Sequence, residues 1–510
     1  MNLILHIFRK DLRHHWIEVF VSLALLIAYS WHVVHEWSSP SLEFSLFSGL
    51  WDAIPALVPA TWCFLIIRAI QDESLVGDRQ FWVTRPYEWT TLLSAKALFG
   101  VTFINLPLFV IDLVLLAKAG FSPTHYLLGL LWMQLMLVII MIVPAAAAGT
   151  VTSTVVQVLL SAVGLVFYLI GVAALTSEIP NAEMSEGAVA GVADLIIVIG
   201  ACIAVVFLQF ARRKTWMSRA LILGAGAAVI LVLVATPYGI LIAHAYPALA
   251  VGQQPAVTLT FDHTPPAPHK KSGSFGELPG NPIIVLPVDV SGVAEGHVGV
   301  LAGLNLTIEA PDGQHWTSSW HSADGHFWPD ENRSSLEFSV DRKFFDRVKT
   351  LPVKIHMTLA QEDFTETDTL QVKTASGKFA VAGVGICWIA PQGGGPADMI
   401  ACHSPLKTPF LTGRMNPSDS TCTYDEDELP PQATRHLWQR GSDSQVGIVP
   451  VDDDNLMFAG SGDNPRKPLP YLCPGTPFTI STPKEGAHSR TELEIDGIVL
   501  SDYQWQPSFD

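Results

Sequence analysis

The sequence predicts an α-helical membrane bundle followed by an all-β, sandwich-like domain in water. Of its 510 residues, 49% are hydrophobic and only 15% are charged, whereas soluble chains carry about 25% charged residues. Residues 1–245 hold 12 Lys and Arg against 14 Asp and Glu, and residues 246–510 hold 18 against 33. The acidic balance therefore belongs to the second half of the chain and argues against a nucleic-acid partner.

Seven apolar stretches in the first half have the length of a membrane span, which is about 20 residues of helix for a hydrocarbon core of about 30 Å. They cover approximately residues 17–35, 53–71, 97–117, 124–147, 151–175, 190–211 and 219–245. The fourth and fifth are separated only by the weakly polar PAAAAGTVTST, so six spans is the alternative count. We predict a polytopic transmembrane domain over residues 1–245.

The segment before the first stretch reads MNLILHIFRKDLRHHW. Ile4, Phe8, Leu12 and Trp16 recur every fourth residue and form one apolar stripe on a helix. This pattern predicts a helix over residues 2–16 that lies in the membrane interface. A basic orientation signal continuous with the first span is the alternative interpretation.

The basic residues predict the orientation. With seven spans, 11 of the 12 Lys and Arg of the first half fall on one side, and only Lys118 does not. By the positive-inside rule the N-terminus is then cytoplasmic, and everything after about residue 246 lies outside. With six spans the second half would lie in the cytoplasm.

The second half has the short β-rich runs and turn-forming residues that are typical of a β domain. Residues 246–280 form a linker that contains TPPAPHKKSGSFGELPGNP. Short β-rich runs follow within residues 281–510: PIIVLPVDV, LNLTIEA, SLEFSV, PVKIHMTLA, KFAVAGVGICWI and TELEIDGIVL. They predict an antiparallel sandwich, with one short helix at DRKFFDRVKT and a loop-dominated region over residues 391–480.

The cysteines divide between the two parts. Cys63 and Cys202 lie in predicted spans, where a thiol is most simply a small apolar group. Four others lie in the second half: Cys387, Cys402, Cys422 and Cys473. An oxidising exterior would allow two disulfides among them, in any of three pairings; free thiols are the alternative.

No catalytic, cofactor-binding or metal-ligating constellation is predicted. The chain has no G-x-x-x-x-G-K-[ST], H-E-x-x-H or G-x-S-x-G motif. His315, His321 and His326 with Asp324 fit no regular ligand spacing, and a surface aromatic loop is the favoured interpretation. DEDE at 425–428 and DDDN at 452–455 lack the spaced acids of a calcium loop and are expected to be solvated loops.

Asp112 is the one acid well inside a predicted span, in INLPLFVIDLVLLAKAG. A lone carboxylate in lipid is costly, so Asp112 should face the bundle, a partner subunit or a watery path. A structural hydrogen bond or a protonated acid is the favoured interpretation. Gln134 and Gln157 are candidate donors between helices.

The segment GDRQFWVTRPYEWTTLLSAK, residues 77–96, separates the second and third stretches and combines charges with aromatic rings. Pro86 cannot continue a helix from the preceding turn, but the residues after it can start one that runs into the third span. We predict a cytoplasmic docking surface made of Asp78, Arg79, Phe81, Trp82, Arg85, Pro86 and Tyr87. Interfacial aromatic anchors with orienting arginines are the alternative.

Two of these segments resemble a known family. FRKDLRHHW leading into a span, and ESLVGDRQFWVTRPYEWTTLLSAKALF, are similar to parts of the membrane (permease) subunits of ATP-binding-cassette transporters of the type-2 exporter family, whose bacterial members often show FW-x-x-RP-x-x-x-x-x-L-x-x-AK. The resemblance covers residues 1–245. It implies an interfacial elbow helix at residues 2–16. It also implies a cytoplasmic coupling loop at residues 72–96, in which residues 72–90 form the coupling element that fits a cleft in a separate ATPase subunit.

The resemblance also implies a function and a location. The chain would be a non-catalytic permease subunit in the bacterial cytoplasmic (inner) membrane, within a homo- or heterodimer of membrane subunits, working with an ATPase in trans. Two features differ from the family pattern, namely seven spans in place of six and the large C-terminal domain. A membrane-anchored outer binding or sensing protein that no longer transports is the second hypothesis, and a membrane enzyme is the third.

The predicted orientation can be tested with reporter fusions. A phosphatase that is active only outside the cytoplasm should be active at the C-terminus and silent at the N-terminus, because 11 of 12 basic residues favour one side. A cytoplasmic reporter that is active at the C-terminus would contradict both the seven spans and the outer domain.

Overall fold

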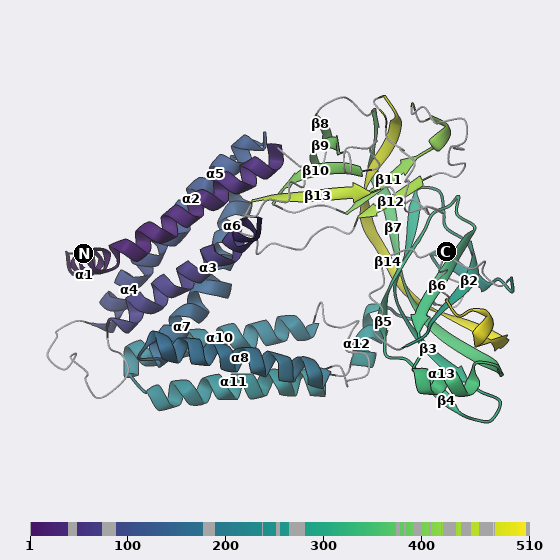
Figure 1. The fold of residues 1–510 in the computed structure, drawn as a ribbon, viewed down its shortest axis with the longest axis horizontal. Helices are drawn as coiled ribbons and strands as arrows, with labels where there is room; N and C mark the ends of the chain where they lie inside the picture. The colour runs from purple at the N-terminus through teal and green to yellow at the C-terminus, as the bar shows by residue number, and fades with distance from the viewer. Residues whose placement is uncertain are drawn as a thin grey trace.

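The computed structural model describes most of the chain and separates it into a helical part and a β part (Figure 1). The described residues are 2–38, 48–73, 88–176, 189–236, 238–250, 255–264, 281–373, 378–381, 384–390, 399–406, 410–419, 421, 435–439, 450–457, 473 and 475–505. Helices form one end of the molecule and the sheets form the other.

Within the described residues, seven helical runs are long and apolar enough to cross a membrane, which confirms the predicted number of candidate spans. They are α2 (Trp16–Ser38), α3 (Ser48–Gln71), α4–η2–α5 (Trp89–Gly100, Val101–Asn105, Leu106–Lys118), α6–η3–α7 (Leu127–Leu137, Val138–Ile142, Val143–Val151), α8 (Val155–Thr176), α10 (Val189–Arg212) and α11 (Thr215–Ala235). This is the architecture of a multi-pass membrane protein.

Three predicted boundaries change. The third run begins at Trp89 instead of 97, so the helix expected to lead from the loop into the span is longer than predicted. The fourth and fifth runs separate at Thr152, where the backbone becomes extended. The seventh run ends at Ala235, and α12 (Tyr238–Ala245) is a separate short helix.

Helix α1 (Asn2–His14) confirms the helix predicted before the first span. Its packed face overlaps the predicted stripe only in part, since Ile4 and Phe8 are partly buried against the core. Ile7, Asp11 and His15 are buried, whereas Trp16 keeps 60% of its surface exposed. The reason is that the chain bends at His15 before α2 begins, so Trp16 belongs to the next helix.

The bundle is packed unevenly. One apolar core joins α1, α2, α3, α4 and α7. Gly149 of α7 lets that helix approach α3, since a Cβ there would lie 3.2 Å from the Ile67 Cα. By contrast, the most apolar stretch of α8 has no buried residue, and those of α10 and α11 have few buried residues. These three helices lie together along one side of the bundle and present apolar side chains outward (Figure 1).

The β part contains three described sheets. One has the order β1-β2-β6, with bounds Thr258–Phe261, Ile283–Ser291 and Arg333–Ser339. The second has the order β13-β10-β9-β8, with bounds Val451–Met457, Met399–Pro405, Gly385–Ala390 and Phe379–Val381. The third has the order β12-β11-β14-β7-β3-β4, with bounds Arg435–Gln439, Leu411–Met415, Pro477–Val499, Pro352–Lys373, His297–Glu309 and His315–Thr317; β5 (His321–Phe327) also pairs with β3.

The third sheet is shared by two layered lobes. Strands β7 and β14 pair along nearly their whole length, with three register shifts. Over one half of this strand pair the sheet β1-β2-β6 and helix α13 (Arg342–Val348) enclose a large apolar core. Over the other half the sheet β13-β10-β9-β8 encloses a smaller one. The β domain is therefore two joined sandwiches.

Five of the six predicted β-rich runs coincide with single strands, and the sixth, KFAVAGVGICWI, is divided between β8 and β9, with residues 382–383 outside the described part. The predicted short helix is α13. The prediction that residues 391–480 are loop-dominated is wrong for their described part, because β10, β11, β12 and β13 lie there. The acidic run at 452–455 is likewise in strand β13, paired with β10, and not in a loop. Strand β13 reads VDDDNLM, and its four consecutive polar residues lack the alternation that predicts a strand.

The β domain contacts the end of the bundle opposite α1 (Figure 1). Val451 and Leu406 pack into an apolar cluster with Val33, Leu115 and Leu130 of the bundle. The second contact follows α12. There the Tyr246 hydroxyl donates to Glu362 Oε1 at 2.6 Å and the ring stacks on His488. The two contacts hold both lobes against the bundle.

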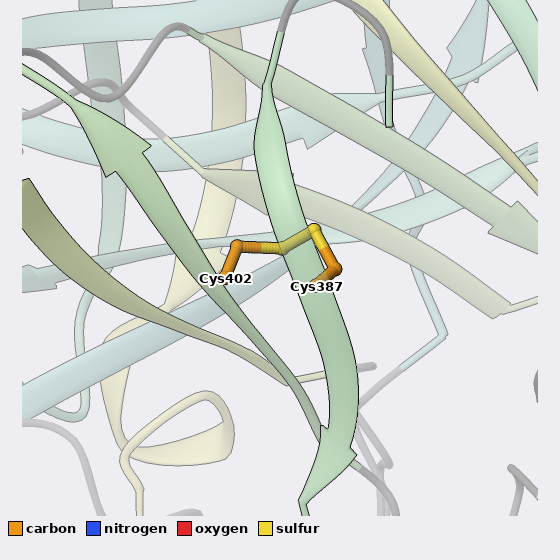
Figure 2. The surroundings of a disulfide bond; sticks show 2 residues. All are labelled: Cys387 and Cys402. Atoms are coloured by element: carbon orange, nitrogen blue, oxygen red, sulfur yellow. A yellow bond between two sulfur atoms is a disulfide. The ribbon is translucent and has the colours of Figure 1, made fainter. Parts of the chain in front are cut away.

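A disulfide joins Cys387 to Cys402 in the second lobe (Figure 2). The two residues lie opposite each other on the neighbouring strands β9 and β10. Cys473 is disulfide-bonded as well, Cys422 lies outside the described residues, and Cys63 and Cys202 are free.

Replacing both Cys387 and Cys402 by Ala should destabilise the second lobe. The bond closes a loop of 15 residues, and a cross-link of that span contributes about 3 kcal/mol to the free energy of unfolding. Thermal unfolding of the purified full chain, with and without reductant, measures the loss. Cys202→Ala is the control. An unfolding temperature that is the same in the double variant and the oxidised wild type would contradict the contribution of this bond.

Candidate functional site

Two helical stems flank the predicted docking loop. Its named residues lie outside the described part of the chain: Asp78, Arg79, Phe81, Trp82, Arg85, Pro86 and Tyr87. The first stem is the end of α3 with the turn at Asp72 and Glu73, and the second is α4 from Trp89 onward. Helix α1 lies against both stems, so these three elements define the candidate site.

Four charged side chains form the centre of the site. Lys96 of α4 donates to Asp11 Oδ2 of α1 at 2.7 Å and to Glu73 Oε1 at 3.2 Å. Lys10 of α1 donates to the same Glu73 oxygen at 3.1 Å. Two cations thus face two carboxylates, and the network joins α1 to both stems of the loop.

Most of this network is buried, and burial shifts the pKa values of its carboxyl groups. Asp11, Glu73 and Lys96 are all buried, while the Lys10 side chain is 46% exposed. Burial raises the pKa of Asp11 above its ordinary value, although Lys96 acts in the opposite direction. Burial acts on Glu73 in the same way, but Lys96 and Lys10 together outweigh it and lower the pKa of this carboxyl. Glu73 is therefore the better stabilised anion of the two.

Aromatic packing supports the ion pairs. The Phe8 ring of α1 stacks on Phe103 with the ring centroids 5.7 Å apart and meets the edge of Phe99 at 6.2 Å. Phe99 and Phe103 are themselves 5.0 Å apart. Because Phe8 and Asp11 are three residues apart on α1, they share one helical face. That face binds α4 through apolar and ionic contacts at once.

Two histidines extend the network at the bend between α1 and α2. His14 Nε2 and His15 Nε2 each lie 3.0 Å from Asp72 Oδ2. His15 is fully buried, and its Nδ1 lies 3.7 Å from Glu18 Oε1. Burial raises the pKa of Asp72, but the two imidazoles and Arg68 outweigh it and the net pKa is lowered.

Asp112 lies in a separate polar group within the bundle. It is fully buried, and its Oδ2 accepts a hydrogen bond from Gln134 Nε2 at 3.2 Å. Gln134 Oε1 in turn accepts from Asn105 Nδ2 at 3.0 Å. The carboxyl thus faces the bundle and joins α5 to α6, as a structural hydrogen bond requires. Gln157, in contrast, accepts from the Ser153 backbone N–H through its Oε1 and caps its own helix.

The β domain holds a further charged cluster. Asp330 accepts from Arg414 at 3.1 Å and lies 2.9 Å from His436 Nε2. The His436 ring stacks on Trp328, with centroids 4.4 Å apart. Burial and the neighbouring Asp330 raise the pKa of Glu331 to about 6. The cluster ties β11 and β12 to the turn after β5.

The histidines predicted as the nearest approach to a metal cluster lie on two strands, His315 on β4 and His321 and His326 on β5. Within the described residues, the group whose donor atoms converge is His14, His15 and Asp72. Sequence reasoning missed it, since Asp72 is far from the histidines along the chain. A signal was available, because His14 and His15 lie in the helix predicted over residues 2–16 and Asp72 begins the predicted coupling element.

Comparisons with known proteins leave the function open. No protein family matches this sequence, and no curated protein is similar to it. Among solved structures, a red sea bream transglutaminase matches 50% of this chain with 10% sequence identity and a TM-score of 0.12. This chain covers 35% of that protein. Such a TM-score carries no argument about fold or function.

Replacing Lys96 by Met should destabilise the α1 end of the bundle. The change keeps most of the side-chain volume but leaves Asp11 without its close cation, and breaking one partner of a buried ion pair costs about 3–5 kcal/mol. Lys10→Met is the matched control, because Lys10 is 46% exposed and an exposed pair contributes about 0–1 kcal/mol. Tryptophan-monitored unfolding of the full chain in micelles measures both. Equal losses for the two variants would contradict the buried network.

Proposed function

We propose that this chain is a permease-like membrane subunit of an ATP-binding-cassette transporter that works with a separate ATPase subunit. Its substrate class stays open. The proposal rests on the resemblance of FRKDLRHHW and of the segment around GDRQFWVTRPYEW to type-2 exporter permeases. The seven candidate spans and the helix before the first of them accord with it.

Within the structure, the observation that most directly supports this proposal is the ionic network at the base of the loop. A loop that receives force from a soluble ATPase must be held by stems that move together, because independent stems would absorb the displacement. Lys96 and Glu73 connect the stems directly, and Asp11 adds α1 to the same unit. Movement of residues 74–87 would thus be transmitted to α1, α3 and α4 as one body.

Beyond this unit, movement at the loop would be transmitted along the membrane-spanning helices. Helix α4 continues through η2 into α5, which reaches the cluster that contacts the β domain. Helix α2 starts beside the network at His15 and ends in the same cluster through Val33. In the proposed mechanism ATP-driven movement at the loop changes which side of a dimer of membrane subunits is open.

The orientation in this proposal has the N-terminus in the cytoplasm and the β domain outside. The distribution of basic residues favours it. The Cys387–Cys402 disulfide adds support, because such bonds persist in oxidising compartments and are rare in the cytosol. The site is then the cytoplasmic face of the subunit, and the inner membrane of a bacterium is its proposed location.

A membrane-anchored outer binding or sensing protein is the alternative. The observation that favours it is the β domain itself, which has two apolar cores of its own and packs on the end of the bundle opposite α1. On this alternative the bundle anchors and orients the β domain, and no ATPase binds the loop.

The double variant Trp82→Ala, Arg85→Ala distinguishes a permease-like subunit that binds an ATPase from an outer binding or sensing protein. Aromatic and Arg side chains are the usual anchors of interfaces, and truncating such an anchor costs about 2 kcal/mol or more, roughly thirtyfold in affinity. We expect the wild-type full chain to retain an ATPase through purification from its native membrane, and the double variant to insert normally but lose it.

The matched control is Trp216→Ala with Arg212→Ala. This pair carries the same two chemical groups at the facing ends of α10 and α11, on the same proposed side, and Trp216 is 81% exposed. The control should keep the ATPase. A double variant at Trp82 and Arg85 that binds the ATPase as strongly as wild type would refute docking through the loop, and a wild-type chain that retains none would favour the outer binding protein.

A further inference from the structure

Next to the four-residue network of Lys10, Asp11, Glu73 and Lys96, the bend between α1 and α2 brings together two imidazoles and a carboxylate. The donor atoms of His14, His15 and Asp72 lie within 4.8 Å of one another. His14 ends α1 and His15 is the bend residue, and their two rings meet edge to face with centroids 4.9 Å apart. On a straight helix, consecutive side chains would diverge by about 100°.

His15 has the environment of a ligand that is already oriented. It is fully buried, and neither ring nitrogen makes a well-formed hydrogen bond within the described part of the chain. A buried imidazole without such a bond is costly. Its Nε2 lies 3.0 Å from Asp72 Oδ2, and on the far side of the ring Nδ1 lies 3.7 Å from Glu18 Oε1. A carboxylate behind the second nitrogen is the usual support of a metal-bound histidine.

We propose that His14 Nε2, His15 Nε2 and an oxygen of Asp72 bind a divalent transition-metal ion, Zn²⁺ in the first place. Two imidazoles and one carboxylate are a ligand set for zinc, at about 2.0–2.2 Å from the ion, with a fourth position left for water. Mg²⁺ and Ca²⁺ prefer sites made of oxygen atoms. The negative charge of Glu18, 3.7 Å from His15 Nδ1, favours the tautomer with the proton on Nδ1 and leaves Nε2 free to bind the ion.

The bound ion links the start of the bundle to the base of the loop. His14 and His15 belong to the α1–α2 bend, and Asp72 immediately precedes Glu73, which pairs with Lys10 and Lys96. The ion therefore adds a second connection between α1 and the end of α3, next to the ionic network. This inference does not depend on the proposed transport function, since it rests on three side chains and their distances.

The test is a titration of the purified full chain with Co²⁺, followed by competition with Zn²⁺. The protein carries a tag without histidine and is treated with chelator beforehand. We expect one equivalent of Co²⁺ to bind, with the visible absorption of a site that contains imidazole nitrogen, and Zn²⁺ to displace it. Mg²⁺ at the same concentration should not.

Three variants make the test specific. His14→Gln should weaken Co²⁺ binding at least tenfold and leave folding intact, because the His14 side chain is 61% exposed. Asp72→Asn should weaken it as well. His6→Gln is the matched control, an exposed histidine on the same helix that is expected to change nothing. Absence of Co²⁺ binding to the wild type, or equal binding by the His14 and His6 variants, would overturn the proposal.

Discussion

The buried ammonium group of Lys96 constrains the whole α1 end of the molecule. A charge removed from water is tolerated only where opposite charges satisfy it, and here the partners come from Asp11 on α1 and Glu73 after α3. The requirement sets the position of α1 across α4 and the distance between the two stems of the loop. The aromatic contacts of Phe8 reinforce that position, while the charges make it specific.

The opposite end of the bundle is organised by apolar contact. Val33, Leu115 and Leu130 form a surface that Val451 and Leu406 of the β domain cover. The two ends thus differ in chemistry: ionic and aromatic where the loop begins, aliphatic where the β domain rests. Helix α2 and the continuous helical run α4–η2–α5 reach both ends. They are the physical link by which a change at one end would be felt at the other, and Asp112 with its amide partners ties α5 to α6 between them.

The described elements show where sequence reasoning succeeds. The seven apolar runs were predictable because helix length against bilayer thickness is a local property. The strands of the first lobe were predictable because their residues alternate or form short apolar runs. Strands β10 to β13 were missed, since their burial depends on a sheet built from distant segments. Trp16 was assigned to the buried stripe because a pattern of every fourth residue does not reveal a bend at His15.

The sequence by itself determined which segments are apolar enough to enter a membrane, which segments are β-rich and where the charges of the loop lie, because composition and periodicity act over a few neighbouring residues. Only the tertiary structure decided which charges meet. Lys96 with Asp11, Asp112 with Gln134, and His14 with Asp72 are partners separated by tens of residues. Their meeting depends on how the helices cross. The candidate site is made of such pairs, since burying several charges together is possible only where different helices supply compensating groups.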